Sequence, residues 1–162
     1  MNKTGVIYGI NGPVVYLKGN TGFKMSEMVY VGKERLVGEV IALTKDTTTV
    51  QVFEETTGLK PGETVTASGD ALSVTLGPGI LNNIFDGIER PLSEIAKQSG
   101  KYISRGLTVD SLDTEKKWDV HVTVSEGEEL MGGAIIAETQ ETRSIVHKSM
   151  VPPDVNGTVI WA

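Results

Sequence analysis

The chain has 162 residues, of which 39% are hydrophobic and 22% are charged, a composition typical of a folded globular protein. Its formal net charge of -6, with no cluster of Lys and Arg, argues against a nucleic-acid partner, because phosphate binding needs clustered cations. The absence of cysteine excludes disulfides and thiolate metal sites. The longest apolar runs, such as Val40-Ile41-Ala42-Leu43, are far shorter than the ~20 residues of a membrane helix, so we expect no direct membrane insertion.

Residues 1–76 have the pattern of an all-β unit. Alternating or β-branched runs predict six or seven short strands, at residues 6–10, 14–17, 28–31, 36–43, 48–53, around 65 and at 73–76. Turn residues separate them, at Asn11-Gly12-Pro13, 19–22, Lys45-Asp46 and 58–62. In the last turn, Pro61 presets φ and Gly62 supplies the positive φ of a type II turn. Many short strands with regular turns favour a closed barrel, because closure removes exposed sheet edges.

The pattern changes over residues 77–106, which we interpret as a linker. Apolar residues between 80 and 88 fit helical spacing, but Gly87 limits that run. Residues 92–99 follow a proline and predict one short helix, and Gly100 fits its C-terminal stop.

From residue 107 onward the sequence returns to a strand pattern, with Val120 and Val122 on one face and His121 on the other. Residues 124–136 resemble a recurring unit of biotinyl- and lipoyl-type barrels, in which a Val-x-x-Gly turn leads to a Gly and an apolar strand. Residues 150–159 resemble the return strand of that unit. The chain ends on the apolar Ile160-Trp161-Ala162 where the second half of such a unit should begin, so we expect a cut chain.

Four blocks of the sequence, at residues 31–41, 54–63, 76–92 and 115–153, carry a resemblance to a known family. In this order they resemble the catalytic A subunit of the V/A-type rotary ATPases. The third block, from Leu76-Gly77-Pro78-Gly79 to Arg90-Pro91-Leu92, resembles the junction after the N-terminal barrel in that family. The insertion that follows resembles the bulge domain of catalytic A subunits, which B subunits and F-type subunits lack.

The resemblance implies a mainly β fold in three parts. We expect an N-terminal closed β-barrel, or crown domain, at 1–76, a linker with a short helix at 77–106, and the first part of a barrel-sandwich-like bulge domain, truncated, at 107–162. The implied parent protein is an ion-translocating ATP synthase or ATPase that couples ATP synthesis or hydrolysis to proton or sodium transport.

The resemblance also implies partners and a location for this segment. In the family, A subunits alternate with B subunits in a hexamer, the barrels hold the ring together, and the bulge contacts peripheral stalk subunits. The complex lies in the cytoplasm, on the inner face of the cell membrane.

The chain lacks the phosphate cradle that ATP hydrolysis needs, usually Gly-x-x-x-x-Gly-Lys-[Ser/Thr] after a strand. Residues 58–64 have glycines and a lysine in the wrong order, and residues 19–26 offer Phe23-Lys24-Met25 where Gly-Lys-Thr is needed. Both segments are better explained as turns. Because the family's P-loop, catalytic glutamate and metal ligand lie downstream, the resemblance assigns no catalytic, cofactor-binding or metal-binding residue here. ATP and Mg²⁺ are expected only in the rest of the parent protein.

Two groups of polar residues are candidates for chemistry, and structural roles are favoured for both. His121 and His147 have no cysteine partners, whereas a metal site needs three or four converging ligands, so His121 is interpreted as a solvent-facing strand residue. Asp86, Glu89 and Arg90 could form an acid/base pair beside a cation, but they lie at a turn before a proline, and no pattern indicates a buried carboxylate.

Two other functions remain as alternatives. A lipoyl- or biotinyl-like carrier module would need a lysine at its hairpin tip, but the expected tip at residues 138–142 has none, and Lys148 lies too near the return strand. A nucleic-acid-binding small barrel is opposed by the acidity of the chain and by its few aromatic residues.

Overall fold

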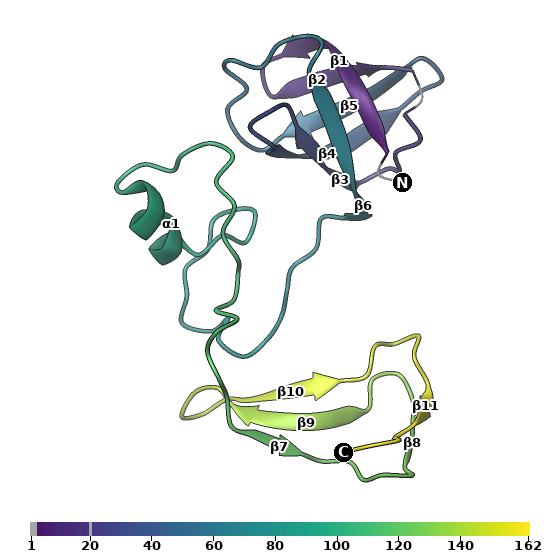
Figure 1. Cartoon of the computed structure of the whole chain (residues 1–162), viewed down its shortest axis with the longest axis vertical. Helices are drawn as coiled ribbons and strands as arrows, with labels where there is room; N and C mark the ends of the chain where they lie inside the picture. The colour runs from purple at the N-terminus through teal and green to yellow at the C-terminus, as the bar shows by residue number, and fades with distance from the viewer. Residues whose placement is uncertain (1–2, 20) are drawn as a thin grey trace. The chain divides into compact units, whose positions relative to one another are not determined.

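The computed structural model describes residues 3–19 and 21–162, and it is mainly β (Figure 1). The chain forms two units, one of residues up to Val74 together with Gln98–Thr108, the other of Thr75–Lys97 and Val109–Ala162. Asn20, in the turn predicted at 19–22, lies outside the described residues. No helix in the described part of the chain is long and apolar enough to cross a membrane.

The first unit contains a closed antiparallel barrel, as the sequence predicts. Its strands are β1 (Thr4–Asn11), β2 (Val14–Lys18), β3 (Glu27–Val31), β4 (Leu36–Leu43), β5 (Thr47–Val52) and β6 (Thr64–Ala71). They follow each other around the barrel in the order β1-β2-β5-β4-β3-β6, and β6 pairs with β1 to complete the ring.

Successive side chains of a strand point to opposite faces, so about every second side chain points into the barrel. These inward side chains are apolar and fill its interior. The buried set is mostly β-branched or leucine and comprises Ile7, Val15, Leu17, Phe23, Val29, Val31, Leu36, Val40, Val50, Val52, Val65 and Ala67. Gly38 interrupts the pattern where β4 approaches β5 closely, since a Cβ there would lie 2.7 Å from the carbonyl oxygen of Gln51.

The prediction of a strand at residues 73–76 is wrong, because β6 ends at Ala71 and residues 73–76 are exposed coil. The last barrel strand is instead β6, which contains the predicted stretch around Val65. Val65 is flanked there by Thr64 and Thr66. The physical reason is closure. Once β6 has paired with both β1 and β3, the barrel has no free edge to accept a further strand.

The second unit begins with an irregular segment that leads to the predicted helix. The apolar residues between 80 and 88 form loops rather than a helix, and an isolated bridge joins Phe85 to Pro91. Helix α1 (Leu92–Ser99) starts directly after Pro91 and buries Ile95. Gly100 follows it with a φ of 73°, which confirms the predicted C-terminal stop.

The remaining strands form two small antiparallel sheets. One has the order β10-β9-β7, and the other pairs β11 with β8. Their bounds are β7 (Val120–Val122), β8 (Glu129–Leu130), β9 (Ile135–Gln140), β10 (Val146–Met150) and β11 (Gly157–Thr158). The side chains of Val120 and Val122 are 55% and 50% exposed, so one face of β7 is open to solvent in this structure.

Candidate functional site

The structure brings Asp86 and Arg90 together in one tight loop. Asp86 Oδ1 accepts hydrogen bonds from the backbone N–H groups of Ile88 (3.1 Å) and Arg90 (2.9 Å), while its Oδ2 lies 2.8 Å from the guanidinium of Arg90. Burial raises the pKa of Asp86, but the hydrogen bonds and charge of Arg90 outweigh that effect, so the pKa lies below its ordinary value. Asp86 is thus partly buried and its pKa is lowered, a feature that no pattern in the sequence indicated.

Glu89, the third member of that group, ties the loop to the start of the second unit. Its Oε2 accepts a hydrogen bond of 2.9 Å from the backbone N–H of Thr75, and its own φ is 64°, in the left-handed region. The carboxylates of Asp86 and Glu89 thus hold backbone N–H groups of the loop and of Thr75 in place. The guanidinium of Arg90, which is always charged, keeps Asp86 ionised. This arrangement suits a structural loop rather than a proton-transfer pair.

A second carboxylate, which the sequence analysis did not single out, connects the β9–β10 hairpin to the Gly-Pro-Gly loop. Glu141 Oε1 accepts hydrogen bonds from the backbone N–H groups of Gly79 (2.8 Å) and Leu81 (2.9 Å). The side chain of Glu141 is only 4% exposed, and its Oε2 lies 3.9 Å from His147 Nδ1. Because two N–H donors converge on one oxygen, the loop acts as a small anion-binding nest. The carboxylate of Glu141 is the anion that occupies it.

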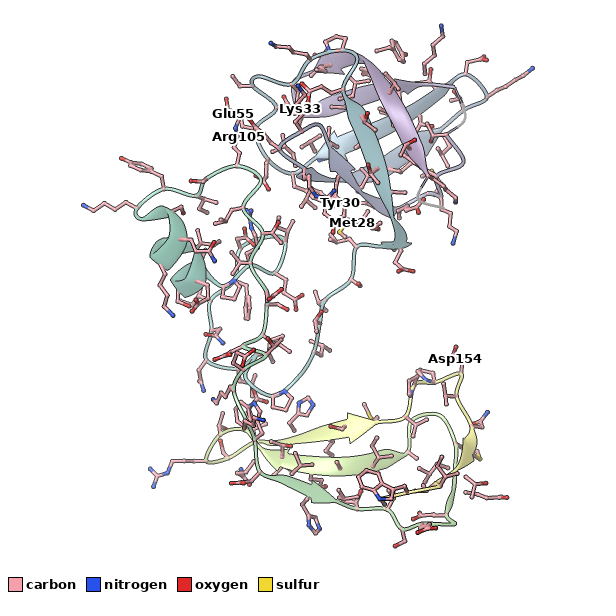
Figure 2. The ribbon with its side chains drawn as sticks, viewed as in Figure 1. Met28, Tyr30, Lys33, Glu55, Arg105 and Asp154 are labelled. Carbon is pink, nitrogen blue, oxygen red and sulfur yellow. The ribbon has the colours of Figure 1, made fainter. Side chains whose placement is uncertain are left out.

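The segment Gln98–Thr108, here called the return segment, contacts the barrel through Arg105. The Arg105 guanidinium donates hydrogen bonds to the carbonyl oxygens of Glu55 (3.3 Å) and Thr57, and it lies 3.1 Å from the carboxylate of Glu34. Figure 2 shows Arg105 next to Glu55 at the end of the barrel. One side chain thus joins the β3–β4 turn to the β5–β6 loop.

Gly106 completes the contact of the return segment. Its backbone N–H donates a hydrogen bond of 2.7 Å to Glu54 Oε2, and its φ is 65°. A Cβ on Gly106 would lie 2.2 Å from the carbonyl oxygen of Glu34, so only glycine fits without movement of the backbone.

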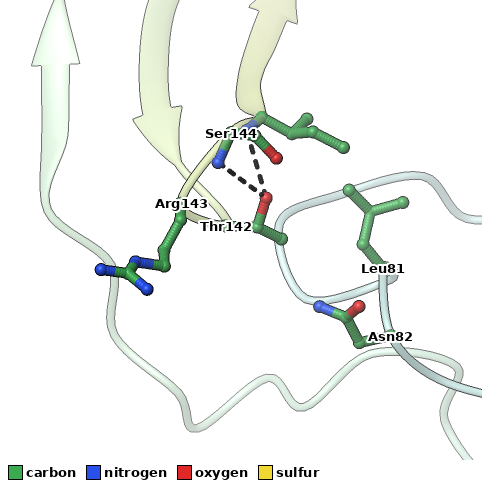
Figure 3. Close-up of a pocket in the computed structure, with 6 residues that line it drawn as sticks. Leu81, Asn82, Thr142, Arg143 and Ser144 are labelled. Atoms are coloured by element: carbon green, nitrogen blue, oxygen red, sulfur yellow. Dashed lines mark hydrogen bonds between the residues drawn. The ribbon is translucent and has the colours of Figure 1, made fainter.

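The turn of the β9–β10 hairpin borders an open depression with Leu81 and Asn82 (Figure 3). The turn is held by Thr142 Oγ1, which accepts hydrogen bonds from the backbone N–H groups of Ser144 (3.4 Å) and Ile145 (3.1 Å). Arg143 extends away from Leu81 and Asn82. The charged side chain therefore does not converge with the other lining groups on one point.

The hairpin geometry also bears on the carrier alternative. The turn lies between Gln140 and Val146, three residues later than the predicted tip, and it contains no lysine. Lys148 lies on β10 opposite Glu138, with 3.8 Å between the ammonium and the carboxylate. A lysine in mid-strand cannot carry a swinging group, so the carrier function is not supported.

The other sequence candidates are turn or strand residues. His121 is exposed on β7, and the described residues contain no group of three His, Cys, Asp or Glu side chains placed to hold a metal ion. In the Gly-rich segment at 58–64, Gly62 has a φ of 95°, as the predicted turn requires. Glu63 there accepts backbone hydrogen bonds from Lys60 and Lys33, both 3.0 Å, so the protein's own carboxylate occupies these donors.

Comparison with known proteins identifies two family domains in the chain. The profile of the ATP synthase alpha/beta family β-barrel domain matches residues 7–69, and that of the ATP synthase alpha/beta subunit barrel-sandwich domain matches residues 109–162. The first match covers most of the barrel, and the second contains both small sheets.

Curated relatives match nearly the whole chain. The V-type ATP synthase alpha chain of Halothermothrix orenii is 51% identical over 160 residues, which are 99% of this chain and 27% of that protein. V-type ATP synthase alpha chain 2 of Clostridium tetani is 52% identical over 155 residues, 96% of this chain and 26% of that protein. The A subunit of the A-type ATP synthase of Methanopyrus kandleri is 52% identical over 156 residues, 96% of this chain and 26% of that protein. The chain thus spans about a quarter of the length of these curated relatives.

Proposed function

Because this chain belongs to the family of V-type and A-type ATP synthase A subunits, we propose that it serves as the N-terminal structural part of such a catalytic subunit. The parent complex would couple ATP synthesis or hydrolysis to proton or sodium transport. The observation that carries the proposal is the closed six-strand barrel, which coincides with the family's barrel domain in a chain about half identical to A subunits along its length.

We assign three parts to the chain. Residues 1–76 form the crown barrel, residues 77–106 form the linker with its short helix, and residues 107–162 form the first part of the bulge domain. The match of the barrel-sandwich profile to residues 109–162 supports the third assignment. Residues 98–106 of the return segment belong to the linker in this division, and Arg105 and Gly106 fix the linker's end to the barrel.

The crown barrel is proposed to hold A and B subunits together in an alternating hexamer. A ring whose catalytic interfaces open and close needs a rigid collar, so that hydrolysis moves a central stalk rather than separating the subunits. A closed barrel suits this task, because every one of its strands is paired on both sides and the interior is filled with side chains.

The remaining assignments follow from the same family membership. The bulge would contact peripheral stalk subunits, and the complex would lie on the cytoplasmic, inner face of the cell membrane. ATP and Mg²⁺ would bind to parts of the parent protein beyond this chain, since the sequence contains no Gly-x-x-x-x-Gly-Lys-[Ser/Thr] motif.

Co-expression of the tagged chain with the B subunit of the same complex tests the proposal. We expect the B subunit to co-purify with the chain. A Val40→Asp variant should not retain it, because Val40 is fully buried in the barrel and a carboxylate there would unfold the domain. A wild-type chain that is folded by circular dichroism but leaves the B subunit unbound would contradict the proposal.

A further inference from the structure

Three peptide bonds of the chain join an asparagine or aspartate to a glycine, at Asn11-Gly12, Asp86-Gly87 and Asn156-Gly157. At such a bond, the backbone nitrogen of the glycine can attack the side-chain carbonyl carbon of the preceding residue and close a succinimide ring. Glycine favours this attack because it has no Cβ to hinder it. In a folded protein, the reaction depends on how firmly the side chain and the nitrogen are held.

The structure protects Asp86 from this reaction. Its Oδ1 accepts hydrogen bonds from the backbone N–H groups of Ile88 and Arg90, and its Oδ2 lies 2.8 Å from the Arg90 guanidinium. Ring closure at an aspartate expels water, so it needs a protonated carboxyl group. Burial raises the pKa of Asp86, but the hydrogen bonds and the charge of Arg90 outweigh this effect and keep the carboxyl ionised.

Asn156 is also held in place. Its Oδ1 accepts a hydrogen bond of 3.1 Å from the backbone N–H of Gly132. Gly157, whose nitrogen would attack, lies in β11 and pairs with Leu130 in β8. The Asn156 side chain can turn toward that nitrogen only after the contact with Gly132 and the pairing of the two strands have opened.

The bond between Asn11 and Gly12 lacks these restraints. Asn11 is the exposed last residue of β1, and Gly12 follows it in the turn to β2 with a φ of 56°. No described residue forms a hydrogen bond with the Asn11 side chain or with the N–H of Gly12. A Cβ on Gly12 would have no atom within 4 Å, so the space around this turn is open.

Two contacts hold the turn against the rest of the barrel. Thr56 Oγ1 donates a hydrogen bond of 2.7 Å to the carbonyl oxygen of Gly12, and the Val52 N–H donates one of 2.8 Å to that of Pro13. Neither contact involves the nitrogen that attacks. Asn11 pairs with Val14 at the end of the β1–β2 ladder, where local opening needs the least free energy. The contacts therefore slow the reaction without preventing it.

We propose that Asn11 is a site of spontaneous deamidation. The Gly12 nitrogen forms a bond to Asn11 Cγ, the bond from Cγ to the side-chain nitrogen breaks, and the proton of the Gly12 N–H leaves with the ammonia. Water then opens the ring. Attack of water on the side-chain carbonyl carbon yields aspartate, whereas attack on the main-chain carbonyl carbon yields isoaspartate. No oxidant or other co-reactant is needed.

The product changes the end of the barrel. Isoaspartate carries the main chain through its side chain, which adds a methylene group to the backbone between β1 and β2 and introduces a negative charge. The pairing of Asn11 with Val14 cannot keep its register with a longer backbone. The modification needs no partner subunit, so it occurs in whatever complex the chain belongs to.

Incubation of the purified chain, followed by peptide mapping with mass spectrometry, tests the proposal. We expect Asn11 to deamidate about tenfold or more faster than Asn156, because the turn opens more easily than the β8–β11 contacts. Labelling by an isoaspartate methyltransferase should detect the product in the wild type and lose that signal in Asn11→Gln, since glutamine must close a larger ring. In urea, Asn11 and Asn156 should react at similar rates, because glycine follows both.

A variant of the threonine contact tests the control that the structure assigns to it. Thr56→Val removes the hydroxyl donor to Gly12 and should accelerate deamidation of Asn11 about threefold to tenfold, the factor that one neutral hydrogen bond contributes. Thr57→Val is the matched control. Its hydroxyl binds Glu55 Oε1 rather than the turn, so the rate should stay at the wild-type value.

The outcomes decide the proposal in either direction. Deamidation that is concentrated at Asn11 in the folded chain and accelerated in Thr56→Val supports it. The proposal is overturned if Asn156 reacts as fast as Asn11 in the folded chain, or if Asn11 stays intact there while it reacts in urea. Equal rates in Thr56→Val and Thr57→Val would overturn the role of the Thr56 contact.

Discussion

Replacing Gly106 with alanine should release the return segment from the barrel. Gly106 has a φ of 65°, a left-handed conformation that costs a residue with a Cβ ~1–2 kcal/mol. The new Cβ would also lie 2.2 Å from the carbonyl oxygen of Glu34, which is a backbone atom, so the segment must move away. That movement breaks the 2.7 Å hydrogen bond from the Gly106 N–H to Glu54.

The magnitude follows from these two losses. A hydrogen bond to a charged group contributes ~1.5–3 kcal/mol in general, and less where solvent screens the charge. Together with the backbone strain, the free energy of opening should fall by ~2 kcal/mol or more. Since 1.4 kcal/mol corresponds to a factor of ten, the open population of the return segment should rise ~30-fold.

Limited trypsin digestion measures this opening directly, because trypsin cleaves after arginine and Arg105 is the residue that holds the contact. While its guanidinium is bound to the carbonyl oxygens of Glu55 and Thr57, the following peptide bond cannot enter the protease. When reclosing is faster than cleavage, the cleavage rate follows the open population. Mass spectrometry should therefore show ~30-fold faster cleavage after Arg105 in Gly106→Ala than in the wild type.

Gly100→Ala is the matched control. Gly100 has a φ of 73°, but a Cβ there would have no atom within 4 Å, so the variant adds similar strain without the overlap. Cleavage after Arg105 should then stay near the wild-type rate. The reasoning is refuted if Gly106→Ala is cleaved no faster than the wild type, or if the two variants accelerate cleavage equally.

Three further predictions concern the second unit and the absent chemistry. The pKa of Asp86 is lowered, so its ionised form stabilises the fold at pH values above the ordinary pKa of 3.8, and this stability is lost as the pH falls further. Urea unfolding should show that Asp86→Asn is less stable than the wild type at pH 7, and this difference should shrink below pH ~4. Glu141→Ala should increase hydrogen exchange of the Gly79 and Leu81 amides at least ~10-fold, because both lose their acceptor, while Glu141→Gln should restore part of the protection; equal exchange in all three proteins would contradict this. Finally, a pure preparation of the chain should not hydrolyse ATP, and a steady release of phosphate would refute the absence of a phosphate cradle.

Local patterns in the sequence predicted much of the fold. The helix at 92–99 was placed correctly, because a proline before it and a glycine after it mark both ends. The closed barrel followed from short alternating segments with frequent turns. The strand at 73–76 was wrong because its apolar alternation is local, whereas the number of strands is decided by which edges remain free when the barrel closes.

The contacts that fix the loops could not be predicted from spacing. Glu141 binds the backbone of Gly79, 62 positions earlier in the sequence, and Arg105 binds Thr57, 48 positions earlier. Such pairs leave no periodic pattern, and a carboxylate that accepts backbone N–H donors needs no particular residue as its partner. The one usable signal was the succession of glycines in the Gly-Pro-Gly loop, which indicates exposed N–H groups but does not say what binds them.

The pairing of β1 with β6 has a consequence for co-translational folding on the ribosome. The register Thr4↔Thr66 joins the first barrel strand to the sixth, so a nascent chain cannot complete the barrel until β6 has emerged from the exit tunnel. Until then, the edge of β1 that will pair with β6 has no partner and can pair with strands of other chains. Truncated products that stop before Ala71 should therefore be captured by chaperones or precipitate, while those a few residues longer stay in solution.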